Sequence, residues 1–456
     1  MTELWKEESS VSFKRIIRIT YPVLLSMLSF NAVVFVDRLY VAQYDLTQFA
    51  AMLPAGFSAI GLASIFTGII GYVSVLAAQS YGAGHYRHCV AAMWQGIYLS
   101  LIFTLLLLLL SPLVSSVFQM MGHVGDLLTY EVEYFYLIII AECIQLFSTA
   151  FFGFYCGIGD TKTTMYVALV TNMVNIVLAG VLVFGKLGMP ALGMFGSGVA
   201  AIISCAVGLI LYLFLLNRKV IKQQYRPLKY CQVNGRLLYS LLRFGLFAGI
   251  QSFLETGCFG IFLLIIGTTG ETNLAAANVA FSMESVFILP VVGMTTAVGI
   301  IAGQERGANR FGNISEVLIK GLVLGICFNI IIFISYNFFP EILISVFHSD
   351  SSNDQNQLIH TATPLVRLAS LWLVLDTVHL MIGSVLKSMG DTQFMMITYA
   401  VVPILFYVII PYMFCTMAQV SLLWLWILLV GYSAVMLIVM TIRFWGGKWK
   451  SIEVIE

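Results

Sequence analysis

Charge is scarce in this sequence. Only 10% of the 456 residues are Asp, Glu, Lys or Arg, whereas 60% are hydrophobic and the mean hydropathy is +0.95. Soluble globular proteins carry charge at about 25% of their positions. The net charge of +1 also gives no excess of positive charge for nucleic-acid phosphates. The composition therefore predicts a protein embedded in a lipid bilayer, without a nucleic-acid partner.

Several chemical signatures are also absent. The eight cysteines are scattered, without a Cys-x-x-Cys pair or a Cys/His spacing suited to a metal, and we interpret them as packing residues. There is no P-loop motif, which argues against direct use of ATP. The polar lead MTELWKEESS carries no short apolar segment with a small-residue cleavage site, so we expect no cleaved signal peptide. No cofactor is predicted.

Long apolar runs, by contrast, are abundant. A helix needs about 20 apolar residues to cross a bilayer. The windows lack the short alternating segments of an outer-membrane barrel, and backbone hydrogen bonding in lipid then requires helices. The predicted fold class is all-α integral membrane, with twelve transmembrane helices. The twelve windows are residues 14–42, 51–78, 90–119, 131–156, 164–184, 192–216, 240–266, 274–302, 314–338, 361–388, 394–414 and 419–445.

Basic residues lie mainly on one side of these spans. Lys and Arg are concentrated before the first span, in residues 217–243 and after the last span, whereas the opposite connections carry mainly acids. Loops rich in Lys and Arg remain in the cytoplasm. We therefore expect both termini and the basic segment to be cytoplasmic, in a cell membrane that is the inner membrane of a bacterium.

The junction after the second span is written twice. AQSYGAGHYRH at residues 78–88 resembles AGQERGANRFG at residues 302–312, and a GDT triplet recurs at 159–161 and 390–392. Because the two repeated stretches follow one another in the same order in each half of the sequence, we predict an internal duplication. We expect an N-terminal six-helix bundle at 1–216, a cytoplasmic basic linker at 217–239 and a C-terminal six-helix bundle at 240–456, related by pseudo-symmetry. Glycines in the junctions are expected to turn the chain after spans two and eight.

A few ionisable residues interrupt the spans. A charge at the bilayer centre costs ~2.5 to 3.5 kcal/mol, so such residues indicate function. Helix rise puts Glu255 and Asp376 at similar depth near the midplane. Gln251 shares the face of Glu255, and Trp372 and His379 share that of Asp376. Two carboxylates so placed predict a site for Na⁺ or for a titrating proton, because burial favours the protonated carboxyl group. Glu284, in the eighth span, is expected to line the cavity.

Together these residues resemble the multidrug and toxic compound extrusion family, known as MATE transporters, over nearly the whole chain. The acids are most similar to the NorM branch, and the resemblance implies that Glu255 and Asp376 form a cation-coupling site and Asp37 a second one. It also implies that Asn175 belongs to the substrate cavity or assists coupling. Arg38 departs from the family pattern, and its guanidinium could neutralise Asp37. The resemblance rests on Pro22, Asp37, Gln79, Gly82, Ala83, Gly84, GIGDT at 157–161, Asn172, Asn175, GMFGSGVAA at 193–201, Glu255 and Asp376.

The function predicted from these residues is ion-coupled antiport. The protein would export small organic cations by alternating access, as a monomer, while H⁺ or Na⁺ enters. One alternative is a lipid-linked saccharide flippase, whose anionic substrate would require Arg and Lys in the cavity. A membrane-embedded enzyme is less favoured, because His379 is the only histidine near an intramembrane carboxylate. A channel would show passive conductance instead.

Overall fold

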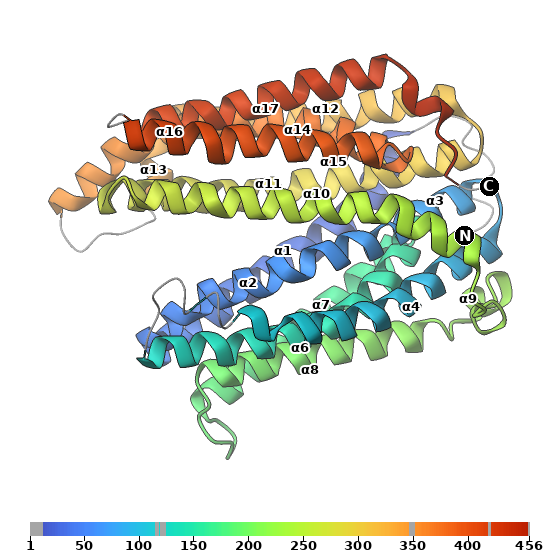
Figure 1. Ribbon diagram of the computed structural model, residues 1–456, viewed down its shortest axis with the longest axis horizontal. Coiled ribbons are helices and arrows are strands. Elements are labelled where there is room, and N and C mark those ends of the chain that lie inside the picture. Colours follow the sequence, from blue (N-terminus) through green and yellow to red (C-terminus); the bar gives the residue numbers. More distant parts are fainter. Residues whose placement is uncertain (1–11, 115–117, 119–124, 346–351, 418–420, 455–456) are drawn as a thin grey trace. The chain divides into compact units, whose positions relative to one another are not determined.

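The structure, a computed structural model, describes residues 12–114, 118, 125–345, 352–417 and 421–454. Within these ranges the chain consists of helices and short connections, without a strand (Figure 1). The polar lead at residues 1–10, where no cleaved signal peptide is expected, lies outside them. Helices are the expected outcome, since a helix satisfies its own backbone hydrogen bonds in lipid.

Twelve helical segments of the described chain are long and apolar enough to cross a membrane. The predicted all-α fold with twelve transmembrane helices is therefore confirmed. The segments are Phe13–Tyr44, Leu46–Gly82, Tyr86–Val114, Gly125–Gly157, Thr161–Phe184, Met194–Leu215, Gly235–Gly267, Ala276–Gly307, Phe311–Phe338, Ile359–Ser388, Thr392–Cys415 and Leu422–Trp445.

Helix contacts divide the chain into two compact units. The first, here the N-terminal unit, comprises Tyr21–Phe253 with Gly307–Asn309 and Val454–Glu456. In it α6 packs against α2, α3, α4 and α8, and α7 packs against α8. The helices of this unit are α1 (Phe13–Tyr44) from Tyr21 onward, α2 (Leu46–Gly71), α3 (Val73–Gly82), α4 (Tyr86–Leu110), α6 (Gly125–Gly157), α7 (Thr161–Phe184), α8 (Met194–Leu215), α9 (Lys219–Gln224), η1 (Pro227–Lys229) and the first part of α10 (Gly235–Gly267).

The second unit, here the C-terminal unit, comprises Met1–Thr20, Leu254–Arg306 and Arg310–Glu453. In it α14 packs against α12, α13 and α17. After Pro403 the eleventh span contains a π-helical turn, η2. Such turns are rare in proteins overall, and those that occur are often found at functional sites. The division of the sequence at residues 217–239 stays a prediction. Besides the rest of α10, this unit contains α11 (Glu271–Gly307), α12 (Phe311–Phe338), α13 (Pro340–Ile344), α14 (Ser352–Ser388), α15 (Thr392–Pro403), η2 (Ile404–Ile409), α16 (Ile410–Met417), α17 (Leu422–Trp445) and η3 (Lys448–Ser451).

The repeated junction has the same backbone conformation in both copies. After α3 the chain turns at Gly84, with φ of +74°, and after α11 it turns at Asn309, with φ of +59°. In each copy the next amide donates to the carbonyl five residues earlier, which satisfies a carbonyl at the helix end. The expected turn is therefore present twice, but the second turn uses an asparagine instead of a glycine. The two hydrogen bonds join His85 to Ser80 at 2.8 Å and Arg310 to Glu305 at 2.9 Å.

The GDT triplets also adopt matching turns. Gly159 and Gly390 both have φ of +83°. The aspartates that follow differ in their partners. Asp160 accepts a hydrogen bond from the Thr163 hydroxyl at 2.7 Å at the start of α7, whereas Asp391 pairs with Arg443 through two contacts of 2.7 and 2.9 Å. The two triplets thus share a local backbone geometry although their side-chain contacts differ.

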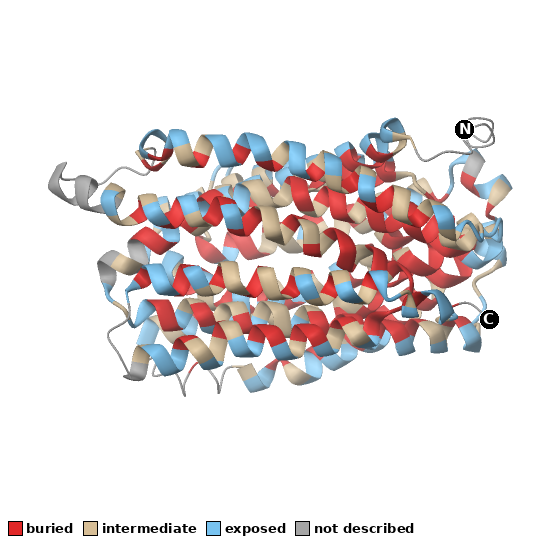
Figure 2. Ribbon diagram, turned by 90° about the horizontal axis from the view of Figure 1, so that it is seen from above, coloured by how far each residue is buried: buried red, intermediate tan, exposed pale blue. Residues whose placement is uncertain are grey.

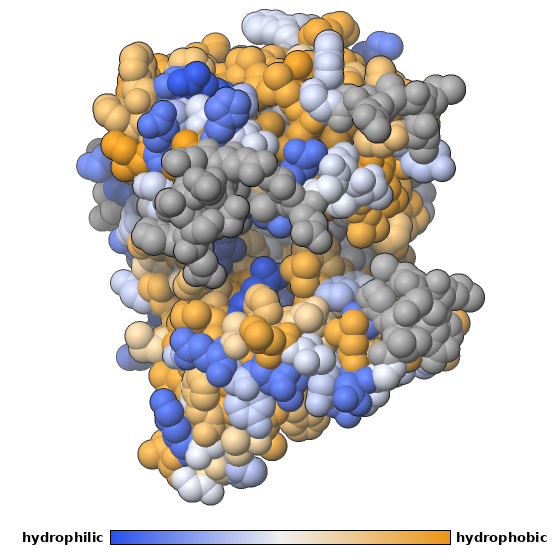
Figure 3. All heavy atoms as spheres, turned by 90° about the vertical axis from the view of Figure 1, so that its left-hand side faces the viewer, coloured by the Kyte–Doolittle hydropathy of each residue, from blue (hydrophilic) through white to orange (hydrophobic). Residues whose placement is uncertain are grey.

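Burial follows the helix faces. In Figure 2 buried and exposed positions alternate along the helices. Large apolar side chains remain exposed along the spans, among them Phe35 at 67% and Leu109 at 73%, as expected where lipid tails cover the surface. Figure 3 shows the molecule from the side at which α1 joins α2. Hydrophilic side chains lie among apolar ones on this face. The spans therefore present apolar sides and more polar ends.

Candidate functional site

The acid of the first span is held by an asparagine. Asp37 on α1 is 8% exposed, and Asn175 on α7 is buried beside it. In the amide orientation that satisfies both neighbours, Asn175 donates to the two carboxyl oxygens of Asp37 at 3.1 and 3.2 Å and accepts from Ser204 on α8 at 3.3 Å. Three helices of the N-terminal unit thus converge on one carboxyl group.

Arg38 does not join this group. It is exposed on α1 while the preceding Asp37 is buried, because successive residues of a helix point about 100° apart. Among the described residues no ion pair joins its guanidinium to Asp37, and neutralisation of Asp37 by Arg38 stays a hypothesis. An amide is the neighbour of the carboxyl group instead.

The acids of the C-terminal unit form a second group. Glu255 on α10, Glu284 on α11 and Asp376 on α14 are all half-buried. Asp376 interacts electrostatically with both glutamates, and Glu255 also interacts with His379 and Lys387. The structure therefore brings together the two predicted coupling acids and adds Glu284 to them. Charge on Asp376 therefore affects both glutamates.

Asp376 is positioned by a histidine and a serine. His379, one helical turn later on α14, places Nε2 2.7 Å from Oδ1 of Asp376. The Ser433 hydroxyl on α17 donates to the same oxygen at 3.0 Å. His379 is buried, and among the described residues its Nδ1 has no hydrogen-bond partner. Asp376 is thus held by side chains of two helices, α14 and α17.

Aromatic rings occupy the same unit. Trp372, one turn before Asp376, is buried with its ring centre 6.2 Å from that of Phe281, which in turn lies 4.8 Å from Trp426. Tyr407, on the π-helical turn, lies 4.5 Å from Tyr432. Such faces attract cations and accept flat apolar groups. The C-terminal unit thus combines carboxylates with aromatic surface.

Gln251 is buried on α10, one turn before Glu255, and its Oε1 accepts no hydrogen bond from the described chain. It belongs to the N-terminal unit, whereas Glu255 belongs to the C-terminal unit. Among the residues that the structure describes, no three His, Cys, Asp or Glu side chains are grouped to hold a metal ion. Any Na⁺ at Glu255 and Asp376 would need neutral oxygens as its further ligands.

Several residues of the site were not predicted from the sequence. Ser433, Tyr432 and Trp426 lie on a helix other than α14, and their spacing in the sequence carries no sign of this proximity. Ser204, the partner of Asn175, was missed for the same reason. Periodicity reports neighbours on one helix only.

The family model MatE matches residues 22–181 and 248–413 of the chain. Among curated proteins, the chain is similar to a probable multidrug resistance protein NorM of Thermotoga maritima, with 25% identity over 384 residues, covering 83% of this chain and 80% of the relative. It is also similar to the probable multidrug resistance protein YoeA of Bacillus subtilis strain 168, with 30% identity over 290 residues and 62% of each chain covered.

Solved structures show the same fold. A crystal structure of MATE in complex with MaL6 matches with a TM-score of 0.86 at 19% identity, covering 96% of this chain and 97% of the other. The outward-facing conformation of a multidrug resistance MATE family transporter of the MOP superfamily matches with a TM-score of 0.84 at 20% identity, covering 96% of each chain. The predicted two-bundle fold class agrees with both.

Proposed function

Because the chain belongs to the MatE family of membrane transporters, we propose that it exports organic cations from the cell in exchange for inward-moving H⁺ or Na⁺. The names of the relatives, probable multidrug resistance proteins, support drug-like substrates. The observation that carries the proposal is the group formed by Glu255, Asp376 and His379 in the C-terminal unit. Its carboxylates supply negative charge for a cation, and its histidine supplies a place for a proton.

Competition for this charge would couple the two fluxes. With Glu255 and Asp376 ionised, a substrate cation is attracted to the carboxylates and to the rings of Trp372 and Phe281. Entry of a proton removes a negative charge and weakens that attraction, so the substrate leaves. Na⁺ bound at the carboxylates would weaken the attraction in the same way, and imposing the two gradients separately distinguishes H⁺ from Na⁺.

Asp37 is proposed as a second coupling residue in the N-terminal unit. Its support is burial within the span together with the two contacts from Asn175. An ionised carboxylate accepts both contacts, whereas a protonated one has less acceptor capacity, so the state of Asp37 would affect how α1 is held to α7. Glu284 and Gln251 are proposed as residues that line the cavity.

We also propose the membrane arrangement. Twelve spans place both ends of the chain on one side, and the basic residues favour the cytoplasmic side of a bacterial inner membrane. The protein would act as a monomer in which bundles 1–216 and 240–456 open in turn to the two sides, with residues 217–239 joining them.

Transport in proteoliposomes tests the proposal. The vesicles are loaded with a fluorescent monovalent organic cation, and an inward H⁺ gradient or an inward Na⁺ gradient is imposed separately. We expect one gradient to accelerate dye efflux, and Glu255→Gln and Asp376→Asn to abolish the acceleration. Glu133→Gln, an exposed acid on α6, is the matched control and should transport normally.

Other outcomes would point elsewhere. If neither gradient accelerates the efflux of several cationic dyes by correctly folded protein, cation antiport is refuted. That result would favour the flippase of lipid-linked saccharides. Ion conductance without dye exchange would favour a channel. Acceleration that survives both substitutions would move the coupling site away from these acids, toward Asp37.

A further inference from the structure

The basic segment between the predicted bundles is folded onto the N-terminal unit. The indole Nε1 of Trp94 on α4 donates to the carbonyl of Pro227 at 2.9 Å. The side-chain amide of the next residue, Gln95, donates to the carbonyl of Gln232 at 3.2 Å and accepts from the backbone amide of Asn234 at 3.1 Å. The backbone of the segment is therefore attached to α4 by both side chains, while its basic residues Lys222, Arg226 and Lys229 are exposed.

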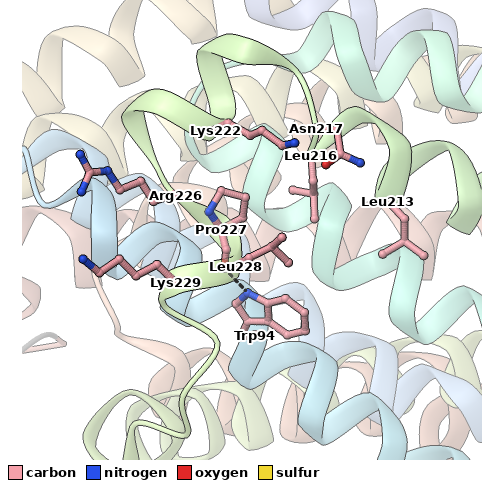
Figure 4. A pocket seen from close by; sticks show the side chains of 9 residues that line it. All are labelled: Trp94, Leu213, Leu216, Asn217, Lys222, Arg226, Pro227, Leu228 and Lys229. Carbon is pink, nitrogen blue, oxygen red and sulfur yellow. Dashed lines mark hydrogen bonds between the residues drawn. The ribbon is translucent and has the colours of Figure 1, made fainter.

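A pocket of about 410 Å³ lies where this segment meets the end of α8. Its size is typical of small-ligand sites. No acidic residue lines it, whereas three lining residues are basic. The pocket is lined by Trp94, Leu213, Leu216, Asn217, Lys222, Arg226, Pro227, Leu228 and Lys229 (Figure 4).

The pocket has two chemically different parts. In Figure 4 Leu228 lies over the Trp94 ring, and Leu213 and Leu216 continue the apolar lining along the end of α8. Lys222 extends toward Asn217 at the rim, whereas Arg226 and Lys229 extend together on the other side of the segment. The site therefore offers an apolar wall next to positive charge, which suits an amphipathic anion.

The position of the pocket at the end of a span restricts the class of ligand further. Leu213 belongs to the last turn of the sixth span, Met194–Leu215, and is exposed, as is the neighbouring Phe214. The apolar wall thus continues a surface that lipid tails cover, while Lys222 lies beyond the end of the span. Tryptophan and basic residues at this depth are typical of the membrane interface.

We propose that this pocket binds the headgroup of an anionic phospholipid. Lys222 and Asn217 would contact the phosphate, Arg226 and Lys229 would attract the lipid from nearby, and the upper part of an acyl chain would lie along Leu213. A free phosphate ion would use the rim but leave the apolar wall uncovered. The inference is independent of what the transporter carries.

Retention of lipid by the purified protein tests this proposal. Full-length protein in a neutral detergent is titrated with dioleoyl phosphatidylglycerol, dioleoyl phosphatidylcholine or inorganic phosphate, and bound molecules are counted by native mass spectrometry. We expect phosphatidylglycerol to bind at least about tenfold more tightly than phosphatidylcholine. Inorganic phosphate should bind more weakly than phosphatidylglycerol, and phosphate that bound as tightly would show an anion site without lipid selectivity and overturn the proposal.

Charge-matched variants locate the site. The double variant Lys222→Gln with Lys229→Gln removes two charges of the pocket, and we expect it to lose about tenfold or more in phosphatidylglycerol affinity. The control is Lys219→Gln with Arg236→Gln, which removes two exposed charges of the same segment outside the pocket lining. Equal loss in both variants would mean that diffuse positive charge attracts the lipid, and no loss in the pocket variant would place the lipid elsewhere. Either result overturns the proposal.

A filling variant serves as a second measurement. Leu213→Trp adds bulk to an exposed position of the apolar wall without changing charge. We expect it to reduce lipid retention while its thermal stability without lipid stays unchanged. Undiminished retention would show that no acyl chain enters the pocket, and the proposed mode of binding would be wrong.

Discussion

The crossing of α2 and α10 allows a substitution whose effect can be worked from distances. Gly245 and Gly249 lie one turn apart on α10 and face Ile65, Gly68 and Ile69 on α2. A Cβ atom on Gly249 would lie 2.3 Å from the carbonyl oxygen of Ile65, and one on Gly68 would lie 2.6 Å from the Cα of Gly249. Small residues let helix backbones approach this closely in membrane proteins.

Gly249→Ala should therefore push the two helices apart. Ordinary contact begins at 3.4 Å, and the obstructing atom is backbone oxygen, which cannot rotate away. The helices would have to separate by about 1 Å, and overpacking of this kind costs about 1–3 kcal/mol. Because Glu255 follows on the same helix, the displacement should also slow transport.

Thermal unfolding in detergent and dye efflux measure the two effects. We expect the midpoint of unfolding of Gly249→Ala to fall by roughly 1 °C for each kcal/mol lost, because the unfolding entropy grows with chain length. Gly257→Ala is the matched control on the same helix, because a Cβ there has nothing within 4 Å. If the two variants unfold and transport alike, the close crossing of α2 and α10 does not exist in the protein and the packing argument is refuted.

Three further predictions concern charged groups. Arg38→Gln should leave coupled dye efflux unchanged, because the side chain is exposed, whereas Asp37→Asn, at a buried position, should reduce efflux strongly. Loss of efflux in Arg38→Gln with normal efflux in Asp37→Asn would show that Arg38, and not Asp37, is needed for coupling. Asp391→Asn removes the charged acceptor of two hydrogen bonds from Arg443 and should destabilise the protein by roughly 2 kcal/mol, seen as a lower unfolding midpoint, and an unchanged midpoint would make the pair energetically neutral. If one monovalent substrate leaves for each H⁺ that enters, no net charge moves, and a 100 mV potential set with valinomycin should not change the substrate gradient at steady state. Exchange of two H⁺ per substrate moves one net charge, and the same potential would change that gradient roughly 50-fold.

The fold was readable from the sequence because lipid imposes one rule on every span. Apolar runs of sufficient length become helices, so the windows and the observed spans differ mainly at their ends. Proximity along one helix was equally accessible. His379 follows Asp376 by three residues, and their contact at 2.7 Å is what helical spacing predicts.

Contacts between helices were the part that the sequence could not supply. Ser433 reaches Asp376 from α17, and no pattern within the twelfth span distinguishes it from other serines. Tyr407 faces Tyr432 from a π-helical turn, where one extra residue shifts the register that a 3.6-residue period assumes. The exposure of Arg38 beside buried Asp37 likewise depends on which face of α1 meets α7.

The left-handed backbone conformation shared by Gly84 and Asn309 also bears on the evolution of the chain. The two positions descend from one ancestral position if the halves arose by duplication, and both keep the left-handed backbone although the residues now differ. Asparagine is among the few residues that accept this conformation at low cost, so the exchange could be tolerated while the turn was retained. In this chain the helix end thus keeps one backbone shape in both copies although its amino acid differs. Related transporters should be compared at this junction by backbone angle as well as by residue identity.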